Sequence, residues 1–147
     1  MSVADDPEGQ ARVAAFRQGL QQLGWAEGRN IRIEYRWGNA DAGRLKSYAA
    51  EVVTAVPDVI LVGGTTALIP TQKATRSIPI VFVGSADPVG QGFVERLPRP
   101  GGNMTGFTIF EVSLVGKLLE ALTQIAPGIA RVALVHSPTN SNAADYW

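Results

Sequence analysis

Hydrophobic and polar positions change their spacing several times along the chain, and each spacing predicts one kind of element. Apolar residues three or four positions apart are typical of amphipathic helices, whereas short continuous apolar runs are typical of strands buried in a parallel sheet. The run Ile31–Tyr35 alternates apolar with charged residues, which indicates a strand with one wet face near a sheet edge. The pattern predicts helices over 7–23, 45–53, from 65 onward, 89–97 and 114–125, and strands over 31–35, 59–62, 78–83, 105–109 and 131–135.

Turn-forming and capping residues fall between these stretches, where element boundaries are expected. Asp6–Glu8 is typical of a helix start, since Asp caps the first turn, Pro fits it and Glu favours the positive end of the helix dipole. Gly24 and Pro127–Gly128 end the first and last predicted helices. Because strand and helix alternate along the chain, we predict an α/β fold with a doubly wound, mostly parallel sheet covered by helices on both faces.

Composition and charge limit the possible functions. The 147 residues are enough for one domain, and thirteen basic residues balance thirteen acidic ones, so no basic field would recruit nucleic acid or an acidic membrane surface. The absence of Cys excludes disulfides, thiolate catalysis and Cys-based zinc sites, and the single histidine, His136, excludes a multi-histidine metal cluster. The N-terminal residues are not a secretory signal, and no stretch approaches the roughly 20 apolar residues of a membrane helix.

Both ends of the pattern are unusual for a doubly wound fold, which normally opens on a strand. The first predicted element is a helix, and the last predicted strand, 131–135, is followed by no helix that would cover it. We therefore expect the sequence to be truncated at both ends.

Ligands of parallel α/β sheets bind outside the carboxyl ends of the strands, and the first loop at such a position is Gly63–Thr66. It opens a helix, so backbone N–H groups beside Gly64 and the hydroxyls of Thr65 and Thr66 are expected to face a ligand. A helix N-terminus of this kind suits a carboxylate or another anion. An interpretation of equal weight is structural: Thr65 is the N-cap of the helix and the glycines form a tight turn.

Two further loops contribute Ser85, Asp87, Phe107 and Thr108 as candidate ligand contacts. Asp87 precedes Pro88, a standard helix start, and we favour capping over ligand contact for its side chain. The ring of Phe107 either stacks on a ligand or fills the core, and we favour the core.

The motifs of nucleotide-binding and catalytic sites are missing from the sequence. Gly63–Thr66 is not followed by the Gly-Lys-Ser/Thr of a phosphate-binding loop, and it is not a GxGxxG run. Asp87 is the one acidic residue expected near the ligand, which leaves no acid–base pair and no nucleophile with its base. We therefore predict a binding protein that uses no cofactor or metal and is not an enzyme.

Several independent runs of residues, spread over almost the whole chain, match one known family. They are Asp6–Leu20, Leu23–Trp25, Glu27–Asn30, Ile33–Trp37, Ile78–Val83 with Ser85, Asp87–Gly90, Arg99–Asn103 and Thr105–Gly106. In this order they resemble the ABC-transporter substrate-binding proteins related to tryptophan-binding lipoproteins.

The resemblance implies one lobe, and the beginning of the next, of a two-lobed type I periplasmic binding protein with a flavodoxin-like strand order. Residues 1–110 would form the incomplete N-terminal lobe, 111–128 a crossover helix, and 129–147 the first strand and loop of the second lobe. A small solute, an aromatic amino acid in characterised members, would bind between the lobes and pass to an ABC permease. The implied location is the periplasm or a lipid anchor. On this chain the solute would meet Gly64, Thr65, Thr66, Ser85, Asp87, Phe107 and Thr108.

In the family's strand order the first strand lies inside the sheet, between the second and third, and this chain lacks it. We expect 131–135 to fill the vacancy, either within the chain or by exchange into a second copy as a strand-swapped homodimer. Two other interpretations remain open: a ligand-sensing module of a regulator or receptor, and a gene fragment without a function of its own.

Overall fold

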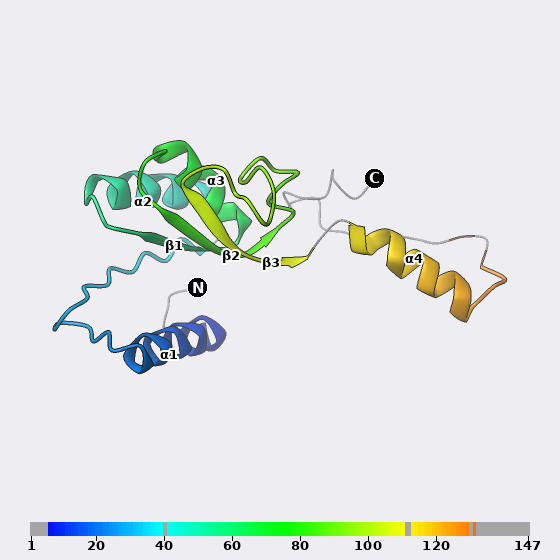
Figure 1. Cartoon of the computed structure of the whole chain (residues 1–147), viewed down its shortest axis with the longest axis horizontal. Helices are drawn as coiled ribbons and strands as arrows, with labels where there is room; N and C mark the ends of the chain where they lie inside the picture. The colour runs from blue at the N-terminus through cyan, green and yellow to red at the C-terminus, as the bar shows by residue number, and fades with distance from the viewer. Residues whose placement is uncertain (1–5, 40, 111–112, 130, 132–147) are drawn as a thin grey trace.

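The computed structural model describes residues 6–39, 41–110, 113–129 and 131, and its body is a parallel sheet. Three strands lie in the order in which they occur in the sequence: β1 (Ile60–Gly63), β2 (Ile80–Ala86) and β3 (Met104–Phe110). Figure 1 shows two helices on one face of this sheet and two that lie away from it. The covering helices are α2 (Ala42–Thr54) and α3 (Thr65–Ala74), and the outlying ones are α1 (Pro7–Gln22) and α4 (Ser113–Ile125). The predicted α/β class with a parallel sheet is confirmed.

An aspartate caps the first turn of α1 and of α2, and the cap of α1 by Asp6 is the predicted one. The carboxylate of Asp6 accepts a hydrogen bond from the amide of Gly9 at 3.0 Å at the start of α1, and that of Asp41 accepts from the amide of Arg44 at 2.9 Å at the start of α2. Each bond satisfies one of the amides that have no partner within a helix. Local capping chemistry is therefore sufficient to position both helix starts.

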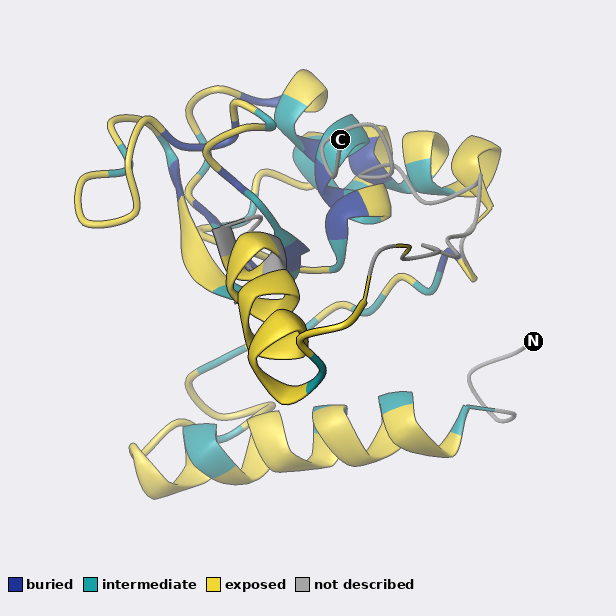
Figure 2. Ribbon diagram, turned by 90° about the vertical axis from the view of Figure 1, so that its right-hand side faces the viewer, coloured by how far each residue is buried: buried dark blue, intermediate teal, exposed yellow. Residues whose placement is uncertain are grey.

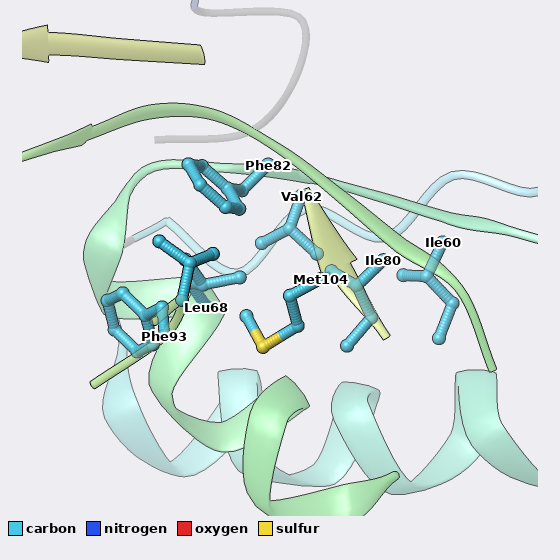
Figure 3. Packing of buried hydrophobic residues seen from close by; sticks show 8 residues of the cluster. Ile60, Val62, Leu68, Ile80, Phe82, Phe93 and Met104 are labelled. Carbon is cyan, nitrogen blue, oxygen red and sulfur yellow. The ribbon is translucent and has the colours of Figure 1, made fainter. Parts of the chain in front are cut away.

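The hydrophobic core lies between the sheet and the helices α2 and α3 (Figure 3). Alternate residues of a strand point to the same face, so every second residue of the three strands faces these helices. The buried strand residues are Ile60, Val62, Ile80, Phe82 and Met104, which form one cluster with Leu68 of α3 and with Phe93 and Val94 of the loop before β3. Through Leu68, this cluster packs the first turns of α3 against the three strands.

Within the described residues, the opposite face of the sheet carries exposed apolar side chains. Leu61, Val83 and Phe107 point to this side and are 49%, 45% and 72% exposed. Val83 and Phe107 are register partners on β2 and β3, so their side chains stand next to each other. The helices α2 and α3 both lie on the other face (Figure 1), and Figure 2 shows α1 and α4 as mostly exposed. The preferred core position for Phe107 is therefore wrong.

The predicted strand Ile31–Tyr35 is wrong as well, because this segment joins no sheet within the described residues. One isolated bridge connects Glu27 to Ile31, and the chain then runs on without a ladder. The alternation survives in the burial, since Ile33 is half-buried while Arg32 is exposed. An alternating pattern indicates which side of an extended chain faces water. A strand also needs a neighbouring strand with which it can exchange hydrogen bonds.

The predicted helix 89–97 is replaced by a series of turns. Gly92 has a φ of +69°, which interrupts a helical path, and the amides of Phe93 and Val94 both donate to the carbonyl oxygen of Pro88. Both side chains are buried in the core although they are adjacent in sequence. Adjacent residues of a helix diverge by about 100° around its axis, so irregular backbone serves this packing better.

Other predictions fall partly or wholly outside the described residues. The predicted strand 131–135 does so from residue 132 onward, and so does His136. The proposed division at 110, 128 and 129 therefore stays a prediction.

Tyr35 lies near the ion pair of Arg17 and Glu27, whose charged atoms are 2.8 Å apart. Its hydroxyl oxygen is buried and meets no hydrogen-bonding group within the described residues. Burial raises the pKa of Tyr35, the Glu27 carboxylate adds to the rise, and Arg17 opposes it. The hydroxyl therefore stays protonated at neutral pH.

Candidate ligand-binding site

Three hydroxyl side chains meet at the carboxyl ends of the parallel strands. Thr65 begins α3 just after β1, Ser85 lies near the end of β2, and Thr108 lies near the end of β3. Oγ1 of Thr65 is 3.3 Å from Oγ of Ser85, and Oγ1 of Thr108 donates to the carbonyl oxygen of Ser85 at 2.7 Å. The expected proximity of these three strand ends is therefore observed.

A bulge in β2 places Ser85 in this group. Val83 pairs with Phe107 and Ser85 with Thr108, so Gly84 is an extra residue on β2, and its φ is +74°. Without the bulge, Val83 and Ser85 would share a face because they are two residues apart. Instead Val83 is exposed on the open face, whereas Ser85 is completely buried, with 0% exposure. The signal for this in the sequence is a glycine inside an apolar strand.

The start of α3 leaves its first turn without a side-chain cap. Its N-cap is Gly64, with a φ of +79°, so the interpretation of Thr65 as the N-cap is wrong. The amide of Gly64 donates to the carbonyl oxygen of Val83 at 2.9 Å, which joins this turn to β2. The first amides of a helix carry partial positive charge, and Thr66 is exposed at this position. This end of α3 is therefore suited to a carboxylate.

Asp87 follows β2 directly and is half-buried, with a φ of +39°. Its Oδ1 accepts from the amide of Gly90 at 3.0 Å and closes a turn, so the predicted role as a helix cap is wrong, because no helix follows Asp87 in the described residues. A positive φ is uncommon outside glycine and is held here by the surrounding structure. The bond to Gly90 thus fixes the Asp87 carboxylate in the turn that begins two residues after Ser85.

The arrangement offers groups for both charges of a zwitterion. The uncapped start of α3 suits an anion, the Asp87 carboxylate suits a cation, and the hydroxyl groups both donate and accept hydrogen bonds. Within the described part of the chain, no three His, Cys, Asp or Glu side chains gather as they would around a metal ion. Phe107 precedes Thr108 in the chain, but its ring lies on the open face of the sheet.

A family model described as ABC transporter substrate binding protein matches residues 2–146 of the chain. The chain belongs to this family. Members of the ABC substrate-binding family are solute-binding proteins, a class distinct from enzymes.

Similar proteins agree with this membership. The chain is 27% identical over 128 residues to a tyrosine-binding protein of Clostridioides difficile, a match that covers 87% of this chain and 36% of that protein. It superposes with a TM-score of 0.73 on a conserved domain protein from Vibrio cholerae, at 31% identity over 92% of this chain and 46% of that one. The TM-score is also 0.73 with a ligand-free, open substrate-binding protein with adhesive properties from Clostridium difficile, at 27% identity over 97% of this chain and 48% of that one.

A further structural likeness shows the fold alone. It is to an ABC domain in complex with L-Trp from Streptococcus pneumonia, with a TM-score of 0.61 at 24% identity, over 65% of this chain and 32% of that one. The chain thus spans less than half the length of each of these relatives. Among the helices of the described residues, none combines the length and apolar character needed to cross a membrane.

Proposed function

We propose that this chain supplies one side of the solute site in the binding protein of an ABC uptake system. The solute would be a small molecule, an amino acid, held between this lobe and a second one. The observation that supports this is the meeting of Thr65, Ser85 and Thr108 at the strand ends, next to the start of α3 and Asp87. Parallel α/β sheets bind their ligands at these carboxyl ends of the strands.

The two charges of an amino acid match the two polar features of the site. The α-carboxylate would accept hydrogen bonds from the first amides of α3, next to Gly64 and Thr66, and the ammonium group would pair with Asp87. Thr65 and Thr108 would form the polar floor between them, with the buried Ser85 beneath it. The exposed ring of Phe107 would take part only at the rim, by stacking on an aromatic side chain.

The proposed cycle is that of a carrier and involves no chemical reaction. After capture outside the cytoplasmic membrane, in the periplasm or on a lipid anchor, the whole protein would deliver the solute to a membrane permease. This proposal rests on the family match and on the tyrosine-binding relative. It includes no enzymatic step, cofactor or nucleic acid.

Thermal unfolding of the chain with a panel of amino acids tests the binding proposal. At a ligand concentration of about 100 times Kd, binding adds about 2.7 kcal/mol to the free energy of unfolding, so the midpoint should rise with L-tyrosine or L-tryptophan. The Asp87→Asn variant keeps an oxygen to accept from Gly90 and tolerates the positive φ, but it loses the charge. We expect its affinity to fall about tenfold or more, with little change in the midpoint without ligand.

Asp58→Asn is the matched control, because Asp58 is exposed and precedes β1, at the opposite end of the strands from Asp87. It should bind like the original chain. If Asp87→Asn binds the amino acid as tightly as the original chain, the Asp87 carboxylate does not contribute to the solute site. A cooperative transition that no amino acid shifts would show that this lobe alone does not bind the solute.

The free edge of β1 supports the proposal of a strand-swapped homodimer. β2 lies on one side of β1, and the other side has no strand from the described residues. Such an edge presents unpaired backbone groups that can accept another strand, and the apolar run 131–135 has the composition of one. Light scattering should give twice the mass of one chain, and deletion of 131–147 should return the mass of a single chain. A single-chain mass at every concentration would exclude the swap.

A further inference from the structure

Ser85 occupies an unusual place in the proposed site, because its side chain is polar and yet completely buried. A residue with no exposed surface in this lobe has no atom with which to touch a solute at the strand ends. Its polar atoms are instead used within the protein. We propose that Ser85 is a positioning residue, which fixes the three ligand-binding loops relative to one another without contacting the solute. The inference rests on the proposed function and assigns a role within that site.

The contacts of Ser85 reach all three loops. Its hydroxyl lies 3.3 Å from that of Thr65 at the start of α3, and it donates to the carbonyl oxygen of Ala86 at 3.4 Å. Its carbonyl oxygen accepts from the hydroxyl of Thr108 at 2.7 Å, at the end of β3. One residue therefore links the β1–α3 loop, the end of β2 and the end of β3.

A second contact leads from the same group to Asp87. The hydroxyl of Thr65 accepts from the amide of Ala86 at 3.4 Å, and Ala86 directly precedes Asp87. The positive φ of Asp87 needs support from its surroundings, and this bond supports the peptide on its N-terminal side. Because the amides of α3 and the carboxylate of Asp87 would hold opposite ends of the solute, their separation depends on the contacts of Thr65 with Ser85 and Ala86.

The bulge at Gly84 makes the contact between Ser85 and Thr65 possible. It turns Ser85 from the open face of the sheet toward α3, at a cost in regular pairing between β2 and β3. A regular strand would place the Ser85 hydroxyl on the exposed side, away from Thr65. The irregular backbone at Gly84 thus brings the buried hydroxyl of Ser85 to Thr65.

The experiment measures the linkage first without ligand, on the full 147-residue chain. The Ser85→Ala variant loses the hydroxyl contact with Thr65 but keeps the carbonyl bond to Thr108, so amide NMR signals and exchange rates should change together at Thr65–Thr66 and at Asp87. Thr75→Val is the control: Thr75 is also a buried hydroxyl, but its oxygen accepts from the amides of Ser77 and Ile78 in the turn before β2. It should leave the three loops unchanged. Changes in Ser85→Ala that stay within 84–86 would overturn the proposal.

Affinity for L-tryptophan, measured by calorimetry, distinguishes positioning from direct contact. Ser85→Ala should weaken binding about fivefold, and the same substitution in a Thr65→Val background should have almost no further effect, because the contact is already lost. Independent, additive losses would mean that Ser85 does not act through Thr65. If the original chain binds no L-tryptophan, the proposed function fails for this probe, and the NMR result still decides the positioning role. If Ser85→Ala does not fold, the isosteric Thr65→Val variant removes the same contact and should disturb the same loops.

Discussion

Replacing Phe82 by alanine should lower the free energy of unfolding by about 3–5 kcal/mol. Phe82 lies on the central strand, is 2% exposed and packs in the cluster with Val62 and Leu68 (Figure 3). Its removal loses the transfer free energy of the ring and leaves a cavity that the sheet and α3 cannot close without moving together. Urea unfolding followed by circular dichroism measures the difference, and the midpoint concentration should fall sharply.

Phe107→Ala is the matched control for this prediction. Phe107 is on the neighbouring strand and is 72% exposed, so the same truncation should change stability by no more than about 0.5 kcal/mol. A similar loss in both variants would mean that the open face of the sheet is covered in solution. Little loss in Phe82→Ala would mean that the cluster described around Phe82 is not the core.

Gly106→Ala is the second substitution with a large expected effect. A Cβ atom at Gly106 would stand 2.0 Å from the carbonyl oxygen of Phe82 and 2.6 Å from its Cγ, distances at which the atoms overlap. The obstacle is the backbone of the central strand, which cannot shift without breaking the pairing of β2 and β3. We expect a loss of about 3 kcal/mol in the free energy of unfolding, measured in the same urea titration.

Gly63→Ala provides the comparison for this position. Gly63 also lies in a strand, but a Cβ there meets no atom within 4 Å, so the substitution should be neutral or stabilise by about 0.5 kcal/mol through the unfolded state. If Gly106→Ala is as harmless as Gly63→Ala, then β3 does not approach β2 as closely as the structure shows.

The elements that could be predicted are those whose signals are local. The capping aspartate before α1 and the apolar run of β1 needed only neighbouring residues to be identified, and the structure places them close to the expected positions. The predicted strand Ile31–Tyr35 and the predicted helix 89–97 were wrong for a shared reason. Each depended on a contact with a distant part of the chain, which a local pattern does not contain.

The location of the candidate site could be predicted from the sequence, but the arrangement of its side chains could not. The rule for the carboxyl ends of parallel strands identified Thr65, Ser85 and Thr108, which the structure brings together. It could not foresee that Ser85 is completely buried, because the bulge at Gly84 reverses the alternation of β2. Nor could it foresee the positive φ of Asp87, which the loop around it imposes.

The sequence by itself determined the α/β class, the parallel strands, the start of α1 and the family, because periodicity, capping and motifs act over a few neighbouring residues. The tertiary structure alone decided which face of the sheet is covered, whether Ile31–Tyr35 pairs, and which hydroxyl groups meet. These depend on hydrogen bonds and packing between segments far apart in the chain, such as Thr65 with Ser85 and Gly106 with Phe82. Their free energy is gained only when both partners are in place, so neither partner's local sequence reveals it.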